Sequence, residues 1–88
     1  MIVAAAIRQD GKIYTGLRHC YIISEMVHRF HLHPPIKGEQ GFVDEAGVFY
    51  DRHTAGVLAI REHQIEKLKW PGMGLDSSEV FPRKEGEA

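Results

Sequence analysis

The sequence has little that would cross-link the chain or attach it to a membrane. Its 88 residues include one cysteine, Cys20, so no disulfide can form within the chain, and a reducing compartment is favoured. No apolar run approaches the roughly 18–20 residues that a membrane span needs. The opening MIVAAAI lacks a preceding basic stretch and meets the polar RQDGK, so no signal peptide is expected. These absences predict a soluble, cytoplasmic protein with no membrane partner.

An excess of charge of either sign is also missing. Eleven Lys and Arg stand against 12 Asp and Glu, which gives a formal net charge of −1. No overall positive field would attract a DNA or RNA polymer, so neither is expected as a partner, although a local basic pocket stays open. A chain of this length is one small domain that buries only about 60–65% of its unfolded surface. Oligomerisation is therefore expected as an additional source of stability.

The first third of the chain has the pattern of a β-hairpin followed by a helix. Ile2–Arg8 is apolar, Asp10-Gly11 is a strong turn signal, and Lys12–Thr15 alternates as a half-buried strand does. Because the first strand is apolar on both faces, we expect it to be central or covered by a partner. A helix is predicted from about Arg18 to about His31, ended by the prolines that follow it. Its predicted apolar stripe is Ile22, Ile23, Met26, Val27 and Phe30.

The same order of elements recurs later without clear sequence identity. Gly41–Val43 and Val48–Tyr50 read as strands around a turn at 44–47, and Asp51 is a good N-cap for a second helix that ends near Gln64-Ile65. Its expected buried stripe is Ala55, Leu58, Ala59 and Ile65.

The last part of the chain shows less pattern. Trp70–Gly74 resembles a loop, Ser77–Glu79 could start one short turn, and 82–88 is expected to be a charged, flexible tail. We therefore predict one α+β domain over residues 1–81. It consists of two β-hairpin-plus-helix units packed as a small antiparallel sheet with two helices, and it is expected to form homo-oligomers.

Residues typical of catalysis or metal binding occur without a complete set. In HRFHLH, His28 and His31 have helical spacing, but no acidic residue or cysteine nearby completes a metal site, so a polar helix end is the plainer interpretation. Cys20 beside His19 points about 100° away from it on a helix, so we expect a small buried thiol rather than a nucleophile. A small hydrolase or metal protein centred on these histidines is kept as a minor alternative.

The carboxylates give no stronger indication of an enzyme. Asp44 and Glu45 fall in an exposed turn, and Asp51 already has a capping role. Gly72 and Gly74 lack the Lys and Ser/Thr of a phosphate-binding loop. The sequence therefore predicts no catalytic residue, no metal and no cofactor.

Arginines at the two predicted helix starts suggest a binding site. Arg18-His19 opens the first helix just after Thr15-Gly16, and Arg52 opens the second. The amides of a helix N-terminus suit a phosphate, and a neighbouring Arg adds a bidentate donor. We expect a ligand or partner site where these two halves of the chain meet.

Aromatic and polar residues around the second strand pair extend this hypothesis. Phe42, Phe49 and Tyr50 could stack on a base, and Gln40 and Asp51 could bond a ribose or a base edge. The alternative interpretation is equally concrete. Phe42 and Phe49 would then be core residues, the arginines would be solvated, and Asp51 would serve only as a cap.

Four segments together resemble a class of small phage and prophage proteins. They are GKIYTGLRH (Gly11–His19), EQGFVDEAGVFYDRHTAGVLAI (Glu39–Ile60), Gln64-Ile65, and DSSEVF (Asp76–Phe81). Among characterised proteins the pattern is most similar to the first Tad family of anti-Thoeris sponges. Those phage proteins bind cyclic ADP-ribose isomers without cleaving them, and some members also resemble sponges for cyclic oligonucleotides. They are homo-oligomers built on dimers.

The resemblance implies a non-catalytic sponge that blocks host antiviral defence from the host cytoplasm, as a dimer or dimer-based hexamer. It implies a cyclic nucleotide as partner. The family's binding roles fall on Arg18-His19, on Phe42 in QGF and on Asp51-Arg52. The expected ligand site also includes their neighbours Thr15, Gln40 and Gly41. Two departures are that Thr54 replaces an expected acidic residue and that HLHPPIK (His31–Lys37) has no counterpart. The alternative function is a small protein-interaction module that inhibits a host enzyme directly.

Overall fold

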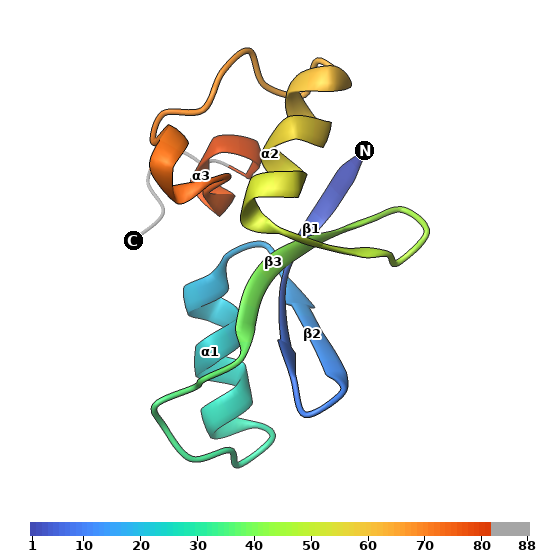
Figure 1. Ribbon diagram of the computed structural model, residues 1–88. Coiled ribbons are helices and arrows are strands. Elements are labelled where there is room, and N and C mark those ends of the chain that lie inside the picture. The colour runs from blue at the N-terminus through green and yellow to red at the C-terminus, as the bar shows by residue number, and fades with distance from the viewer. Residues whose placement is uncertain (82–88) are drawn as a thin grey trace.

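The computed structural model describes residues 1–81, and the charged tail expected at 82–88 lies outside them. Four strands form one antiparallel sheet, and three helices accompany it (Figure 1). The predicted α+β class is confirmed. In chain order, the elements are β1 (Ile2–Gln9), β2 (Lys12–Gly16), α1 (His19–His28), β3 (Glu39–Asp44), β4 (Phe49–Asp51), α2 (Arg52–Arg61), the 3-10 turn η1 (Pro71–Met73) and α3 (Ser77–Val80).

The sheet has the order β2-β1-β3-β4, so the apolar first strand is internal, as expected. Ala6 of β1 lies opposite Thr15 on one side and opposite Gly41 on the other, and Gly41 in turn lies opposite Asp51. Residues that face each other across neighbouring strands point to the same side of a sheet. This row and the next, which contains Ala5 and Phe42, therefore belong to opposite faces.

An irregularity near the start of β1 lets Ile2 join Ala5 and Ile7 in the core. The register with β3 shifts between Ile2 and Ala4, which leaves Val3 as the extra residue of a β-bulge. The bulge lets Ile2 turn inward, where it is 1% exposed. The side-chain amide of Gln64 holds this backbone: it accepts from the Ile2 N–H at 3.0 Å and donates to the Ile2 carbonyl at 2.7 Å.

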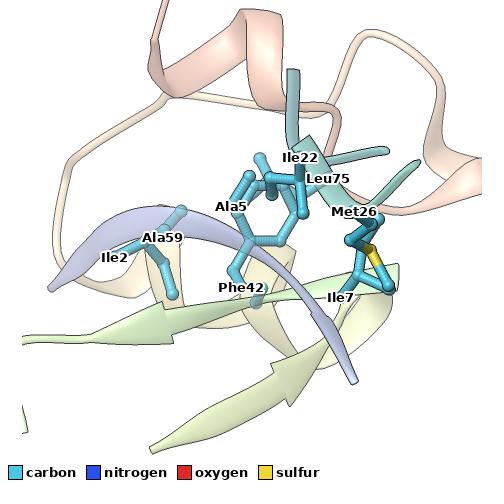
Figure 2. Close-up of a cluster of buried hydrophobic side chains, with 9 residues drawn as sticks. Ile2, Ala5, Ile7, Ile22, Met26, Phe42, Ala59 and Leu75 are labelled. Carbon is cyan, nitrogen blue, oxygen red and sulfur yellow. The ribbon is translucent and has the colours of Figure 1, made fainter. Parts of the chain in front are cut away.

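The core fills the space between one face of the sheet and the helices. Helix α1 packs against β1 and β2, and α2 packs against β3, β4 and β1. Figure 2 shows the Phe42 ring among the buried side chains of this layer. The buried cluster consists of Ile2, Ala5, Ile7, Ile22, Met26, Phe42, Ala55, Ala59 and Leu75. The opposite face of the sheet carries Arg8, Ile13, Thr15 and Glu39, all of them exposed.

Both long helices end earlier than the sequence predicts. Helix α1 stops at His28 rather than near His31, because His31 adopts a left-handed φ of 57°. Helix α2 stops at Arg61 rather than near Ile65, and His63 takes the same conformation with φ 58°. The N–H groups that follow fold back onto earlier carbonyls, a common way to close a helix C-terminus. The Gln64 N–H, for example, donates to the Ala59 carbonyl at 2.8 Å.

The segment after α2 belongs to the core, which its sequence pattern does not suggest. Leu75 is fully buried and joins Ile22 of α1 and Ala55 of α2 in one cluster. Its N–H donates to the Arg52 carbonyl at 2.9 Å, and the Arg52 Nε–H donates to the Leu75 carbonyl at 2.9 Å. The short turn expected at Ser77–Glu79 forms as α3, which Asp76 and Glu79 start with a reciprocal capping box. Figure 1 shows α3 beside α2 and above α1.

Across residues 1–81, no helix combines the length and apolarity that crossing a membrane would require.

Candidate functional site

Three of the residues that the sequence assigns to ligand binding lie in one row across the sheet. Thr15, Gly41 and Asp51 occupy β2, β3 and β4, with Ala6 of β1 between the first two. At a strand spacing of about 4.8 Å, three steps separate Thr15 from Asp51 by about 14 Å. The row is therefore ordered but does not converge on a single point.

His19 lies inside the protein and links α1 to the sheet. Its Nε2 is 2.8 Å from the Gly41 carbonyl oxygen, so this nitrogen carries the proton and donates. Its ring meets Phe42 edge to face at a centroid distance of 5.2 Å. Burial lowers the pKa of His19, and the positive charge of Arg52 lowers it further, against the opposing effects of the Gly41 hydrogen bond and Asp76. The neutral ring thus has a structural role at the start of α1.

The neighbouring cysteine is on the surface, so the prediction of a buried thiol was wrong. Cys20 is exposed, whereas His19 is 9% exposed. Ile22 and Met26 form the inward line of α1, and His19 continues that line one turn earlier. Cys20 lies about 100° away from it.

The two phenylalanines of the predicted stacking face have different surroundings. Phe42 is 0% exposed and fills the core, the alternative considered from the sequence, so it has no free face for a base. Phe49 is half-buried on the other side of the sheet and lies directly over Gly41. A Cβ on Gly41 would lie 2.5 Å from the Phe49 Cζ and 2.2 Å from the Tyr50 carbonyl oxygen. The glycine of the QGF motif is required by this close approach.

The N-terminus of α2 is occupied by groups of the protein itself. The Asp51 carboxylate accepts from the Thr54 N–H at 2.7 Å, which confirms it as the N-cap, and this hydrogen bond lowers its pKa. Arg52 is turned toward the C-terminal segment, where its guanidinium lies 3.8 Å from the Asp76 carboxylate. Asp76 and Leu75 therefore fill the junction where a ligand was expected.

The remaining predicted residues are Arg18 and Gln40. Arg18 is the extended N-cap residue of α1, half-buried, and its side chain makes no capping hydrogen bond. Gln40 is exposed on β3, opposite Ile7.

The turn between β3 and β4 uses its carboxylate for structure. Asp44 accepts from the N–H groups of Ala46 and Val48, at 2.9 and 3.0 Å, and from the Tyr50 hydroxyl at 2.9 Å. The bond from Val48 is the main reason that the pKa of Asp44 is lowered. This carboxylate is therefore held ionised as an acceptor.

A depression that the sequence did not indicate lies at the opposite end of the sheet. It has a volume of about 540 Å³ and lies between the β1–β2 hairpin end and the segment before β3. We name it the Arg8–Lys37 pocket. Its lining residues are Arg8, Gln9, Asp10, His33, Pro34, Pro35, Lys37, Gly38 and Glu39. It combines two permanent cations and an imidazole with two carboxylates.

Packing and stacking hold the walls of the Arg8–Lys37 pocket. A Cβ on Gly38 would lie 2.6 Å from the Ile7 Cγ2, so this wall runs tightly along β1. The Arg8 guanidinium contacts the Glu39 carboxylate and stacks 4.5 Å above the Phe49 ring. Gln9 Oε1 is buried without a hydrogen-bond partner in the part of the chain that the structure describes.

The sequence gives only a faint signal for this pocket. Arg8 reads as the end of a strand, and HLHPPIK matches no known motif. The signal is the basic character of the loop, with His33 and Lys37 on either side of two prolines. Their approach to Arg8 depends on the pairing of β1 with β3, which joins positions 31 residues apart.

A second depression of about 420 Å³ is lined by Ile65, Glu66, Lys67, Lys69, Ser78 and Glu79. The Glu79 carboxylate there already accepts two hydrogen bonds from the backbone. It accepts from the Lys69 N–H at 2.6 Å and from the Asp76 N–H at 2.9 Å. Within residues 1–81, no three His, Cys, Asp or Glu side chains gather as a metal site.

The fold and its pockets define a small α+β protein with helices on one face of an antiparallel sheet. The chain belongs to the phage T4 y16D protein family, whose model matches residues 1–83. No curated protein and no solved structure matches it significantly. The prediction of a small phage protein is thereby confirmed, and the finer resemblance to anti-Thoeris sponges stays a prediction.

Proposed function

We propose that this phage protein is a non-catalytic sponge that binds and sequesters a cyclic nucleotide signal of host immunity in its Arg8–Lys37 pocket. The observation that carries the proposal is that Arg8, His33 and Lys37, together with the carboxylates of Asp10 and Glu39, line one depression of about 540 Å³. Arg and Lys are the main phosphate-binding side chains in proteins. The resemblance to the anti-Thoeris sponges supports the same class of ligand.

The other polar groups of the pocket suit the sugar of a nucleotide. Asp10 and Glu39 offer carboxylate oxygens, which accept hydrogen bonds from hydroxyl groups. Phe49 lies beneath Arg8 and supports its guanidinium from the side away from the pocket lining. The site proposed for the ligand is thus at the hairpin end of the sheet, and not at the junction of the two helix starts.

The strength of these contacts bears on the number of subunits. Hydrogen bonds to charged groups contribute about 1.5–3 kcal/mol each. Two of them, from Arg8 and Lys37, give about 3–6 kcal/mol before the cost of association. Nanomolar sequestration needs about 12 kcal/mol. We therefore include in the proposal a homo-oligomer in which a second subunit covers the open side of the pocket.

A sponge must bind without breaking its ligand. Two of the side chains that suggested chemistry, His19 and Cys20, are placed apart from the pocket, whereas His33 of the HRFHLH string lines it. His19 is buried against Gly41, and Cys20 is on the surface of α1. The placement of His19 and Cys20 supports binding without turnover.

The test is isothermal titration calorimetry of the protein with cyclic ADP-ribose isomers and with cyclic di- and trinucleotides. One of these ligands should bind, and it should be recovered intact after heat denaturation of the complex. Lys37→Gln should weaken binding at least about tenfold, while Lys12→Gln, an exposed lysine of β2 outside the pocket, should leave it unchanged. Recovery of a cleaved product would indicate an enzyme, and absence of binding to every ligand would refute the proposal.

One observation favours the second candidate, a module that binds a host protein directly. The sheet face that lacks helices exposes Ile13 by 44%, and Leu17 just after β2 is 60% exposed. Large exposed apolar patches mark protein interaction sites, and these two side chains would contribute to one. In a pull-down with host lysate, this function predicts that Ile13→Asp abolishes capture of a host enzyme and that Lys37→Gln does not.

A further inference from the structure

In the Arg8–Lys37 pocket, the guanidinium of Arg8 is already paired with a carboxylate of the protein itself. Arg8 and Glu39 lie directly opposite each other in β1 and β3, and their side chains form an ion pair. Both are about half exposed, at 50% and 48% of the side chain. Because the Phe49 ring supports the guanidinium from below, Arg8 keeps a defined plane at the rim of the pocket.

The permanent charges that line the pocket balance one another. Its permanent cations are Arg8 and Lys37, and its carboxylates are Asp10 and Glu39. An incoming phosphate must therefore compete with a resident carboxylate for the guanidinium. Of the two carboxylates, Glu39 is the one in contact with Arg8, whereas Asp10 occupies the hairpin turn with φ 52°.

An exchange of partners resolves this competition. A phosphate oxygen is an alternative acceptor for the Arg8 N–H groups, and the pair is exposed enough for Glu39 to turn away at little cost. The released carboxylate then lies beside the bound phosphate and needs a hydrogen-bond donor. A hydroxyl group next to the phosphate, as in a sugar phosphate, supplies one.

We infer that Glu39 determines the specificity of the pocket: it yields Arg8 to a ligand phosphate and accepts a hydroxyl of the same ligand. The pocket then takes phosphorylated sugars that carry free hydroxyl groups and disfavours plain phosphate anions, which leave the displaced carboxylate unpaired. This inference rests on the proposed function, because it concerns the same pocket, and it adds the residue that selects the ligand.

The experiment compares inorganic pyrophosphate with cyclic ADP-ribose in titrations at low ionic strength, where interactions of exposed charges are least screened. Glu39→Gln should bind pyrophosphate at least about tenfold more tightly than the wild type. The preference for cyclic ADP-ribose over pyrophosphate should fall by a similar factor. Arg8→Gln should bind neither probe measurably.

The matched control is Glu25→Gln, which removes an equally exposed carboxylate from an ion pair with Arg29 on α1. It should leave both affinities as in the wild type. Equal gains for Glu25→Gln and Glu39→Gln would mean a general charge effect and would overturn the inference, as would undetectable pyrophosphate binding by Glu39→Gln. A further outcome is that the wild type binds no cyclic nucleotide while Glu39→Gln binds pyrophosphate more tightly than the wild type does. This combination would reject both the sponge function and the selective role of Glu39, and it would retain the pocket as an anion site.

Discussion

Substituting Gly41 by alanine tests the arrangement at the centre of the sheet. The new Cβ would lie 2.2 Å from the Tyr50 carbonyl oxygen, 2.5 Å from the Phe49 Cζ and 3.0 Å from its Cε1. The ring can rotate away, but the carbonyl belongs to the paired strand β4 and cannot move without disturbing the ladder. Overpacking costs about 1–3 kcal/mol, and a fixed backbone atom at 2.2 Å places this site at the upper end. Replacing a strand glycine recovers about 0.5–1 kcal/mol, so the net loss should be about 2 kcal/mol.

The measurement is urea unfolding followed by circular dichroism, with thermal unfolding beside it. A loss of about 2 kcal/mol corresponds to a fall in Tm of about 8–16 °C for a domain of this size. Gly72→Ala is the control, because a Cβ there meets nothing within 4 Å, and it should change stability by no more than about 0.5 kcal/mol. If Gly41→Ala matched this control with an unchanged m-value, the close approach of β4 and Phe49 to Gly41 would be refuted.

Three further predictions concern the junction of the helices. Because burial lowers the pKa of His19 in the folded protein, the unfolded chain takes up this proton at a higher pH than the folded chain does. The stability that the neutral ring contributes is therefore complete above about pH 6.5 and falls by at most about 1.4 kcal/mol per pH unit as the pH drops toward the folded pKa. His19→Gln should reduce this slope. Leu75→Ala should cost about 2–5 kcal/mol in chemical denaturation, whereas Val57→Ala, 57% exposed on α2, should stay within about 0.5 kcal/mol. Asp76→Ala should lose about 1 kcal/mol through the capping box of α3, and Asp76→Asn, which keeps an acceptor oxygen, should recover most of it.

Each of these three has an outcome that would contradict it. Identical pH slopes between pH 5.5 and 7.5 for the wild type and His19→Gln would show that this ring does not titrate differently on folding. Equal unfolding midpoints for the Leu75 and Val57 variants would place the C-terminal segment outside the core. An Asn variant as unstable as the Ala variant would assign the effect to the charge beside Arg52 rather than to the cap.

Local patterns predicted most of the elements, because their causes are local. The Asp10-Gly11 turn fixes the first hairpin, with Gly11 at φ 78°, and Asp51 starts α2 through a contact three residues away. The apolar character of β1 on both faces indicated its internal position. The errors of detail lie in α1 and just after its end. Phe30, predicted in the apolar stripe, is 45% exposed. Cys20, predicted to be buried, is exposed, and His19, predicted to bind a ligand, is the buried residue of the pair.

The site depends on contacts that no short pattern encodes. Leu75 is one apolar residue in an irregular segment, and its burial follows from hydrogen bonds with Arg52, 23 positions earlier. Phe42 and Phe49 look alike in sequence, and only the pleat of β3 and the position of Gly41 decide which one is in the core. The Arg8–Lys37 pocket joins a strand end to a loop across the sheet. Predicting it requires the β1–β3 register first.

The late position of Leu75 among the described residues also affects how the protein folds during synthesis. During synthesis the first hairpin and α1 emerge early. The apolar face that they share with Phe42 is covered only when Leu75 has also left the ribosome. Until then the emerging chain presents an uncovered apolar surface, the kind of species that aggregates or attracts chaperones. Variants in which synthesis pauses between β3 and Leu75 should therefore lower the yield of soluble protein more than their equilibrium stability suggests.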